Sequence, residues 1–146
     1  MTRLLELAKR IGLFACALGV ATTVQAACID DAGGPQIEKF ETFKAAMLEG
    51  NFELAAAQVD MGGNRENEVV RGLNRLKLQG LEGFDRCVLL SRRVHSPNFT
   101  SEILYFTVGA DVEYWLLLSA VQVDGEVSLT DVTLSDSYKR FREWLQ

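Results

Sequence analysis

The stretch 112-VEYWLLLSAVQVDGEVSLTDVTLS-135 decides the fold of this 146-residue chain. Residues 112–123 are apolar in both alternating sets, which is typical of a strand covered on both faces. Asp124-Gly125 favours a type I′ turn, because that turn needs positive φ at both central positions. Residues 127–134 predict the partner strand, and their apolar parity changes near Thr130-Asp131, which indicates a β-bulge. The sequence therefore predicts an antiparallel hairpin at this point.

Two further strands are expected before this hairpin, at residues 86–94 and 99–108, because each is followed by turn residues, Ser96-Pro97-Asn98 and Gly109-Ala110-Asp111. Each consecutive pair of strands is separated by a short turn, so neighbours in sequence should pair in the sheet. We therefore expect a curved four-stranded antiparallel meander.

Upstream of the sheet the apolar period becomes helical, and three helices are expected. Gly50-Asn51 should end the first, Met61-Gly62-Gly63 the second, and Asn64 should cap the third. The apolar positions that define their buried sides are Ile37, Phe40, Phe43, Met47 and Leu48, then Phe52, Ala55, Ala56 and Val59, then Val69, Val70, Leu73 and Leu76. These helices should cover one face of the sheet.

The other sheet face needs a cover of its own, because an uncovered apolar face of that size would be an association site. A short amphipathic helix from Ser137, with Phe141, Trp144 and Leu145 on its apolar side, is one candidate. A second subunit, giving a homodimer through the sheet face, is the other. The fold class expected is α+β, with N-terminal helices packed on the sheet.

This order resembles the NTF2-like (SnoaL-like, cystatin-like α+β) superfamily. The residues that carry the resemblance are 40-FETFKAAMLEGNFELAAAQV-59 and 103-ILYFTVGADVEYWLLLSAVQVDGEVSLTDVTLS-135. The resemblance implies one domain over residues 36–146, with a sheet curved round a helix to form a cone-shaped pocket. Enzymatic members place an acid or a histidine in that pocket, whereas others bind a ligand or dimerise through the convex sheet face. Because it is a likeness of architecture, it does not by itself carry function.

Residues 1–26 have the pattern of a secretory signal peptide. A basic start is followed by the uncharged apolar run 11–24 and by the small residue Ala26. The run is shorter than the roughly 20 residues that a membrane-spanning helix needs. Cleavage near Ala26 would leave residues 27–35 as an N-terminal segment and place the protein in the periplasm or outside the cell.

Export gives the cysteines a chemical context. Cys16 would leave with the signal, so Cys28 and Cys87 are the two that remain, and two thiols in an oxidising compartment usually pair. The alternative is that Cys28 is the lipid-bearing first residue of an anchored protein. The triplet Gln25-Ala26-Ala27 has the small pair of a lipoprotein signal but lacks its aliphatic residue. A membrane partner is expected only in that alternative.

Charge and motif content exclude several classes of function. Without the signal, 12 basic residues face 19 acidic ones, so the field disfavours nucleic-acid binding. No phosphate-binding loop, nucleophile elbow or cluster with metal-ligand spacing is present, so no metal and no cofactor is expected.

No residue set predicts catalysis, and the weak candidates are His95, the single histidine, and Asp111 in a turn. Tyr105, Tyr114 and Trp115 are candidates for a pocket that takes an apolar or aromatic ligand, although large aromatic residues of this kind more often belong to a core or an interface.

Arg92 and Arg93 complete the candidate pocket residues, because consecutive residues of a strand point to opposite faces and one of them should point inward. An inward arginine needs a carboxylate, such as Glu102 or Glu113, or an anionic ligand.

The expectation is thus an exported, non-catalytic domain of the bacterial envelope that binds a small apolar or anionic ligand or a protein. The alternatives are a small hydrolase or isomerase that uses His95 with a nearby acid, and an envelope lipoprotein anchored through Cys28.

Overall fold

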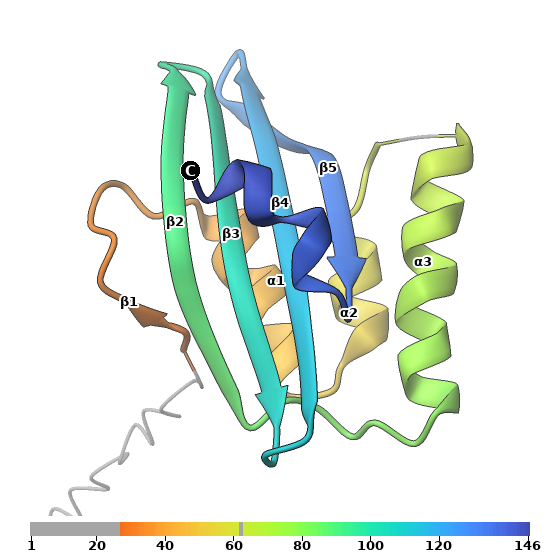
Figure 1. The fold of residues 1–146 in the computed structure, drawn as a ribbon. Helices are drawn as coiled ribbons and strands as arrows, with labels where there is room; N and C mark the ends of the chain where they lie inside the picture. The colour runs from red at the N-terminus through yellow and green to blue at the C-terminus, as the bar shows by residue number, and fades with distance from the viewer. Residues whose placement is uncertain (1–26, 62) are drawn as a thin grey trace, which may run out of the picture.

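The computed structural model describes residues 27–61 and 63–146, so the signal sequence predicted at residues 1–26 lies outside the described residues. Three helices precede the main strands, as the apolar periodicity indicates (Figure 1). They are α1 (Glu38–Leu48), α2 (Phe52–Ala57) and α3 (Gly63–Leu78). No helix among the described residues is long and apolar enough to cross a membrane.

The sheet has five strands and is mixed, whereas the sequence predicted four antiparallel strands. Four strands form the expected antiparallel meander: β2 (Arg86–Ser96), β3 (Phe99–Val108), β4 (Val112–Val123) and β5 (Glu126–Ser135). The additional strand, β1 (Ile29–Asp30), pairs parallel to β2 at Val88 and Leu89. A strand of two residues carries no alternation to detect, so the N-terminal segment gave no sign of it. The sheet is open, and β1 and β5 lie at its two edges (Figure 1).

The β4–β5 hairpin confirms the local predictions made from residues 112–135. Asp124 and Gly125 both have positive φ, 52° and 85°, as a type I′ turn requires. Ser119 pairs with Asp131 and the next residue, Ala120, pairs with Leu129, so Thr130 is the extra residue of a β-bulge. The change of apolar parity along β5 is therefore a true register change.

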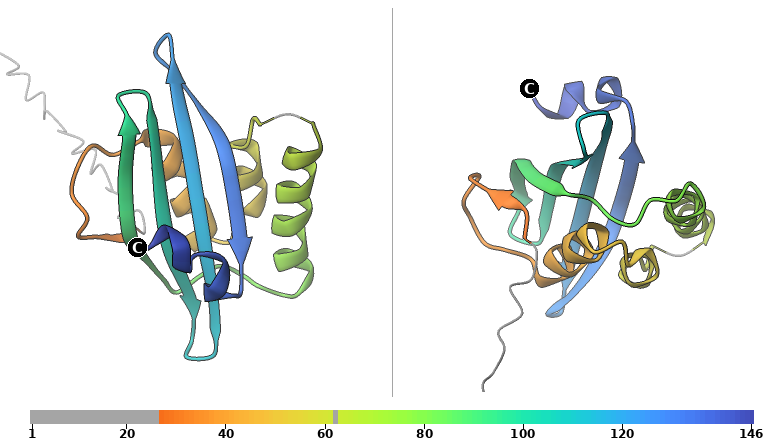
Figure 2. Two further views of the ribbon diagram at one scale, coloured as in Figure 1. Left: turned by 45° about the horizontal axis from the view of Figure 1, so that its top comes forward. Right: turned by 90° about the horizontal axis from the view of Figure 1, so that it is seen from below.

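Both faces of the central strand β4 are covered, by different parts of the chain (Figure 2). On the helix side, Leu116 and Leu118 join the main core with residues of all three helices. On the other side, Leu117 packs with Ile103 and Phe141. The C-terminal cover is not the amphipathic helix expected from Ser137 but two short 3₁₀ turns, Tyr138–Arg140 and Arg142–Trp144.

The loop before β2 lies directly against the turn between α1 and α2. Gly50 and Gly83, both with positive φ, face each other there, and a Cβ on Gly50 would lie 1.9 Å from the carbonyl oxygen of Glu82. The N–H of Phe84 donates to the carbonyl of Leu48 at 3.2 Å across the same contact. Only residues without a side chain permit this approach, which sets where the sheet begins relative to the helices.

We predict that Gly50→Ala is far more destabilising than Gly80→Ala, measured as the free energy of unfolding in urea. Both glycines have positive φ, but the site of a Cβ on Gly80 is open. Gly80→Ala should therefore cost only the roughly 1–2 kcal/mol of the left-handed conformation. Gly50→Ala must also displace backbone, and should cost about 4 kcal/mol or more. Equal losses in the two variants would contradict the close approach.

A disulfide joins Cys28 to Cys87, the two cysteines predicted to remain and pair after export, with 4.5 Å between the two Cα atoms. It holds the N-terminal segment against β2 at the point where β1 pairs with that strand. A sulfur bonded to Cys87 is not available to a lipid, so the two uses considered for Cys28 exclude each other.

We expect the double variant Cys28→Ala/Cys87→Ala to lose roughly 3–4 kcal/mol of unfolding free energy, because the bond closes a long loop and restricts the unfolded chain. Thermal and urea unfolding of the oxidised chain measure the loss. A thiol reductant should lower the stability of the wild-type chain by a similar amount and leave the double variant unchanged. A wild-type chain that is insensitive to reductant would count against the bond.

Candidate functional site

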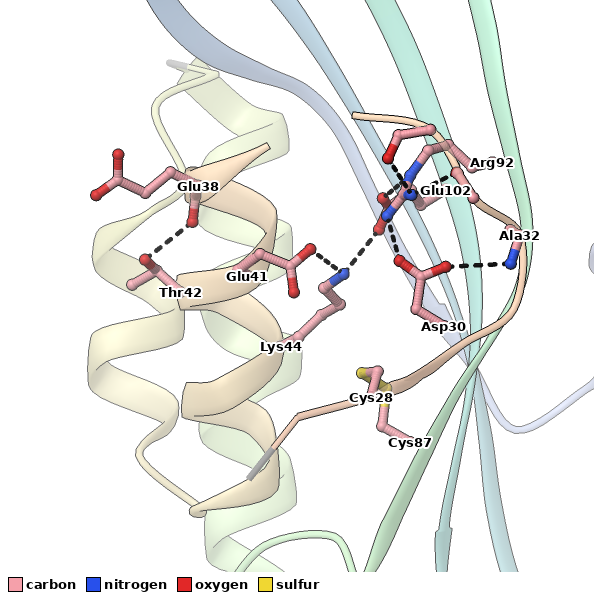
Figure 3. Close-up of polar contacts among 12 residues, drawn as sticks. Cys28, Asp30, Ala32, Glu38, Glu41, Thr42, Lys44, Cys87, Arg92 and Glu102 are labelled. Carbon is pink, nitrogen blue, oxygen red and sulfur yellow. Dashed lines mark hydrogen bonds and ion pairs between the residues drawn. A yellow bond between two sulfur atoms is a disulfide. The ribbon is translucent and has the colours of Figure 1, made fainter. Parts of the chain in front are cut away.

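Five charged side chains form a network on the helix-facing side of the sheet, close to the disulfide (Figure 3). Arg92 Nε donates to Glu102 Oε1 at 2.7 Å, and Lys44 Nζ of α1 donates to Glu102 Oε2 at 3.1 Å. Arg92 also donates from Nη2 to Asp30 Oδ2 of β1 at 2.9 Å, and Lys44 reaches Glu41. Of the pair Arg92 and Arg93, the first points inward and the second is exposed.

Acidic and basic groups alternate through this network, and their mutual effect is resolved at Arg92 and Asp30. Burial alone would lower the pKa of Arg92, but the hydrogen bonds and charges of Glu102 and Asp30 outweigh it and raise that pKa. Burial would raise the pKa of Asp30, but the hydrogen bond and the charge of Arg92 outweigh burial, so that this pKa lies below its ordinary value. Glu102 is fully buried with a cation on each oxygen. The network therefore joins α1, β1, β2 and β3, and its groups already have partners.

The other sequence-predicted pocket residues do not share one site. Tyr105 and Trp115 lie on the outer sheet face, where Trp115 packs against Tyr138 with ring centroids 4.9 Å apart. Tyr114 lies on the helix side, edge-on to Phe84. Tyr105 donates its O–H to Glu113 at 2.7 Å, and this hydrogen bond raises the pKa of the tyrosine.

His95 and Asp111 are not brought together either. His95 lies at the end of β2, with Nε2 2.7 Å from Ser101 Oγ and its ring stacked on Phe99. Asp111 lies in the turn that follows β3, at the far end of that strand. The ten residues of β3 span about 30 Å, so the geometry gives no support to a catalytic pair of His95 with Asp111.

A cleft of about 400 Å³ lies between α3 and the edge strand β5. This volume is within the range of ligand pockets, roughly 300–1,000 Å³. Its apolar lining consists of Met61, Val69, Leu73, Leu116, Val132 and Leu134, and its polar lining of Arg65, Glu68, Asp131, Thr133 and Arg140. Gly72 completes the helix wall, and a Cβ added there meets no atom within 4 Å.

The backbone of β5 also faces this cleft. Leu129 donates its N–H outward to Asp60 Oδ1 at 3.0 Å, and Gln122 of β4 donates its N–H to Asn98 on the β3 side. Ala120 and Leu129 are therefore a non-hydrogen-bonded pair. Along an antiparallel pair of strands, hydrogen-bonded and non-hydrogen-bonded pairs alternate. Beyond the bulge, the same alternation turns the N–H and C=O groups of Val132 and Leu134 away from β4, towards the cleft.

This cleft was not predicted from the sequence. Two signals were present: a glycine inside the amphipathic helix pattern of α3, and a strand that ends the meander and must therefore be an edge. Neither signal shows that α3 stands beside that edge. Comparisons with protein families, with curated proteins and with solved structures give no match, so the candidate site rests on this geometry.

The lowered pKa of Asp30 predicts an acid-sensitive contribution to stability. Because the folded-state pKa lies below the unfolded value of about 3.9, the contribution is complete above that value and is lost as the pH falls through the folded pKa. Asp30→Asn should flatten the fall of unfolding free energy below about pH 4, measured by urea unfolding at a series of pH values. Asp31→Asn is the matched control, because Asp31 is exposed and has no ion pair among the described residues. Identical profiles for the two variants would refute the role of Asp30.

Proposed function

We propose that this chain is an exported, non-catalytic binding domain of the bacterial envelope that takes its ligand in the cleft between α3 and β5. The observation that carries the proposal is the cleft itself, which combines an apolar floor, charged side chains and an open strand edge. The signal-like residues 1–26 and the Cys28–Cys87 disulfide support export, since such bonds persist in oxidising compartments.

Gly72 supports a role for the empty space. A glycine inside a helix is about 1 kcal/mol less favourable than alanine, and no neighbouring atom requires its absence of a side chain. Because Gly72 has no side chain, this part of α3 leaves the cleft unfilled. A binding role for the cleft gives a reason for a residue that the packing alone does not explain.

The NTF2-like relationship belongs to this proposal as well, supported by three helices followed by an antiparallel meander. Dimerisation through the outer sheet face is a further part of it. The C-terminal turns occupy the area around Leu117, so a second copy would have to use the rest of that face.

The test uses 1-anilinonaphthalene-8-sulfonate, an apolar aromatic anion, as the probe in a fluorescence titration of the oxidised chain. Gly72→Gln should weaken binding at least tenfold, because the added side chain extends into the cleft without a backbone clash. Asn74→Gln, on the same helix but outside the cleft lining, should bind like the wild type.

The stability of the variants separates blocking from unfolding. Both replacements are good helix formers, and Gly72→Gln should raise the unfolding free energy by up to about 1 kcal/mol. A stable Gly72→Gln chain that binds the probe as well as the wild type would refute the cleft as the binding site.

A further inference from the structure

We propose, as an extension that rests on the proposed function, that the natural occupant of the cleft is an extended peptide segment of a partner protein. The segment adds to the open edge of β5 as a sixth strand and places alternate side chains against α3. Backbone hydrogen bonds give such strand addition its affinity, and the side-chain pockets give it its specificity.

The backbone N–H and C=O groups of Val132 and Leu134 favour a ligand that can pair with a strand edge. Both point away from β4, and Val132 is buried, with 7% of its surface exposed. Among the described residues no side chain and no backbone group outside the sheet pairs with them. The unpaired N–H and C=O groups of an open edge strand are a template for pairing with another chain. A ligand that supplies both donors and acceptors is therefore the expected partner.

The two halves of the β5 edge differ in whether side chains of the chain itself pair with the backbone. Before the bulge, Lys39 Nζ donates to the carbonyl of Val127 at 3.2 Å, and Asp60 accepts the N–H of Leu129 at 3.0 Å. The hydrogen bond and charge of Lys39 hold Asp60 in its charged form, and its pKa is lowered despite burial. Side chains thus occupy the edge at Val127 and Leu129, whereas the edge at Val132 and Leu134 opens into the cleft.

Spacing distinguishes a peptide from a compact small molecule. Successive outward-facing residues of a strand are about 6.6 Å apart, twice the rise per residue. Each presents a donor and an acceptor side by side, and an extended chain repeats the same pattern at the same interval. A compact apolar ligand fills the cleft but does not match two such pairs.

The lining also indicates the side chains of the peptide. One set would face the apolar residues Val69 and Leu73 of α3, so alternate positions should be apolar. Arg65 and Arg140 line the cleft without an ion pair to any of the described residues. An acidic residue within or beside the apolar positions would pair with one of them.

The experiment begins with a displayed library of random dodecapeptides, selected on the oxidised chain and counter-selected on its Gly72→Gln variant. Selected peptides are synthesised, and amide hydrogen exchange of the isotopically labelled chain is followed by NMR with and without each peptide. The amides of Val132 and Leu134 should exchange at least tenfold more slowly in the complex. The amide of Thr133, which points towards β4, should change little and serves as the internal control.

Methylation of the peptide's own nitrogens gives the complementary readout. N-methylation at one alternating set of positions should weaken binding at least tenfold, and methylation at the other set should not. Peptides that bind without protecting Val132 and Leu134, or that tolerate methylation at every position, would overturn strand addition. So would a library that yields no binder dependent on Gly72.

The two proposals fail in different ways. If Gly72→Gln blocks the fluorescent anion but no peptide is selected, the cleft remains a binding site and the peptide inference is wrong. If Gly72→Gln weakens the binding of neither the fluorescent anion nor any peptide, the proposed function is wrong as well.

Discussion

The rest of the structure depends on the burial of one carboxylate. Glu102 is fully buried in the middle of β3, and it is stable there only because Arg92 and Lys44 each neutralise one of its oxygens. Removing one partner from such an arrangement typically costs about 3–5 kcal/mol, a large part of the roughly 5–15 kcal/mol by which a native domain is stable. Lys44 must therefore stand over β3, which fixes α1 on the sheet. Arg92 in turn draws Asp30, and with it the N-terminal segment, to the β2 edge.

The position of the cleft depends on how deeply each of the three helices is buried. α1 and α2 contribute fully buried residues to the core, Phe40, Phe43, Met47, Phe52 and Ala55, whereas α3 contributes only Leu73 and Leu76 as buried residues. The longest helix is thus the one least embedded, and it stands beside β5 rather than across the sheet (Figure 2). The space that this leaves is bounded by a helix on one side and by a strand edge on the other.

How much of this could be predicted from the sequence depends on the range of the interactions involved. The turn Asp124-Gly125 and the change of apolar alternation at Thr130 are local features, so the hairpin and its bulge could be predicted from a short stretch of sequence. Arg92 beside Arg93 indicated one inward arginine, and Glu102 was among the carboxylates named for it. Lys44 was missed, because it lies within an apolar helix pattern and a lysine there usually extends to solvent.

The remaining features were out of reach because they join distant segments. β1 has two residues, and its place is set by the disulfide and by Arg92 rather than by its own sequence. The cleft requires the position of α3 relative to β5, which no pattern within either element contains. Tyr105, Tyr114 and Trp115 were grouped by residue type, but strand alternation separates Tyr114 from the other two.

The unequal edges of the sheet have a consequence for assembly. β1 pairs with part of β2, and irregularities after Leu89 and Val94 interrupt the rest of that edge. Growth of a cross-β fibre requires two complementary edges on every copy, so that each added chain offers a new template. Among the described residues, the longest open stretch of edge is the part of β5 beyond its bulge, at Val132 and Leu134. When two copies of the chain pair through β5, each has used this edge and has no second edge of the same kind, so association between copies through β5 ends at a closed complex of defined size.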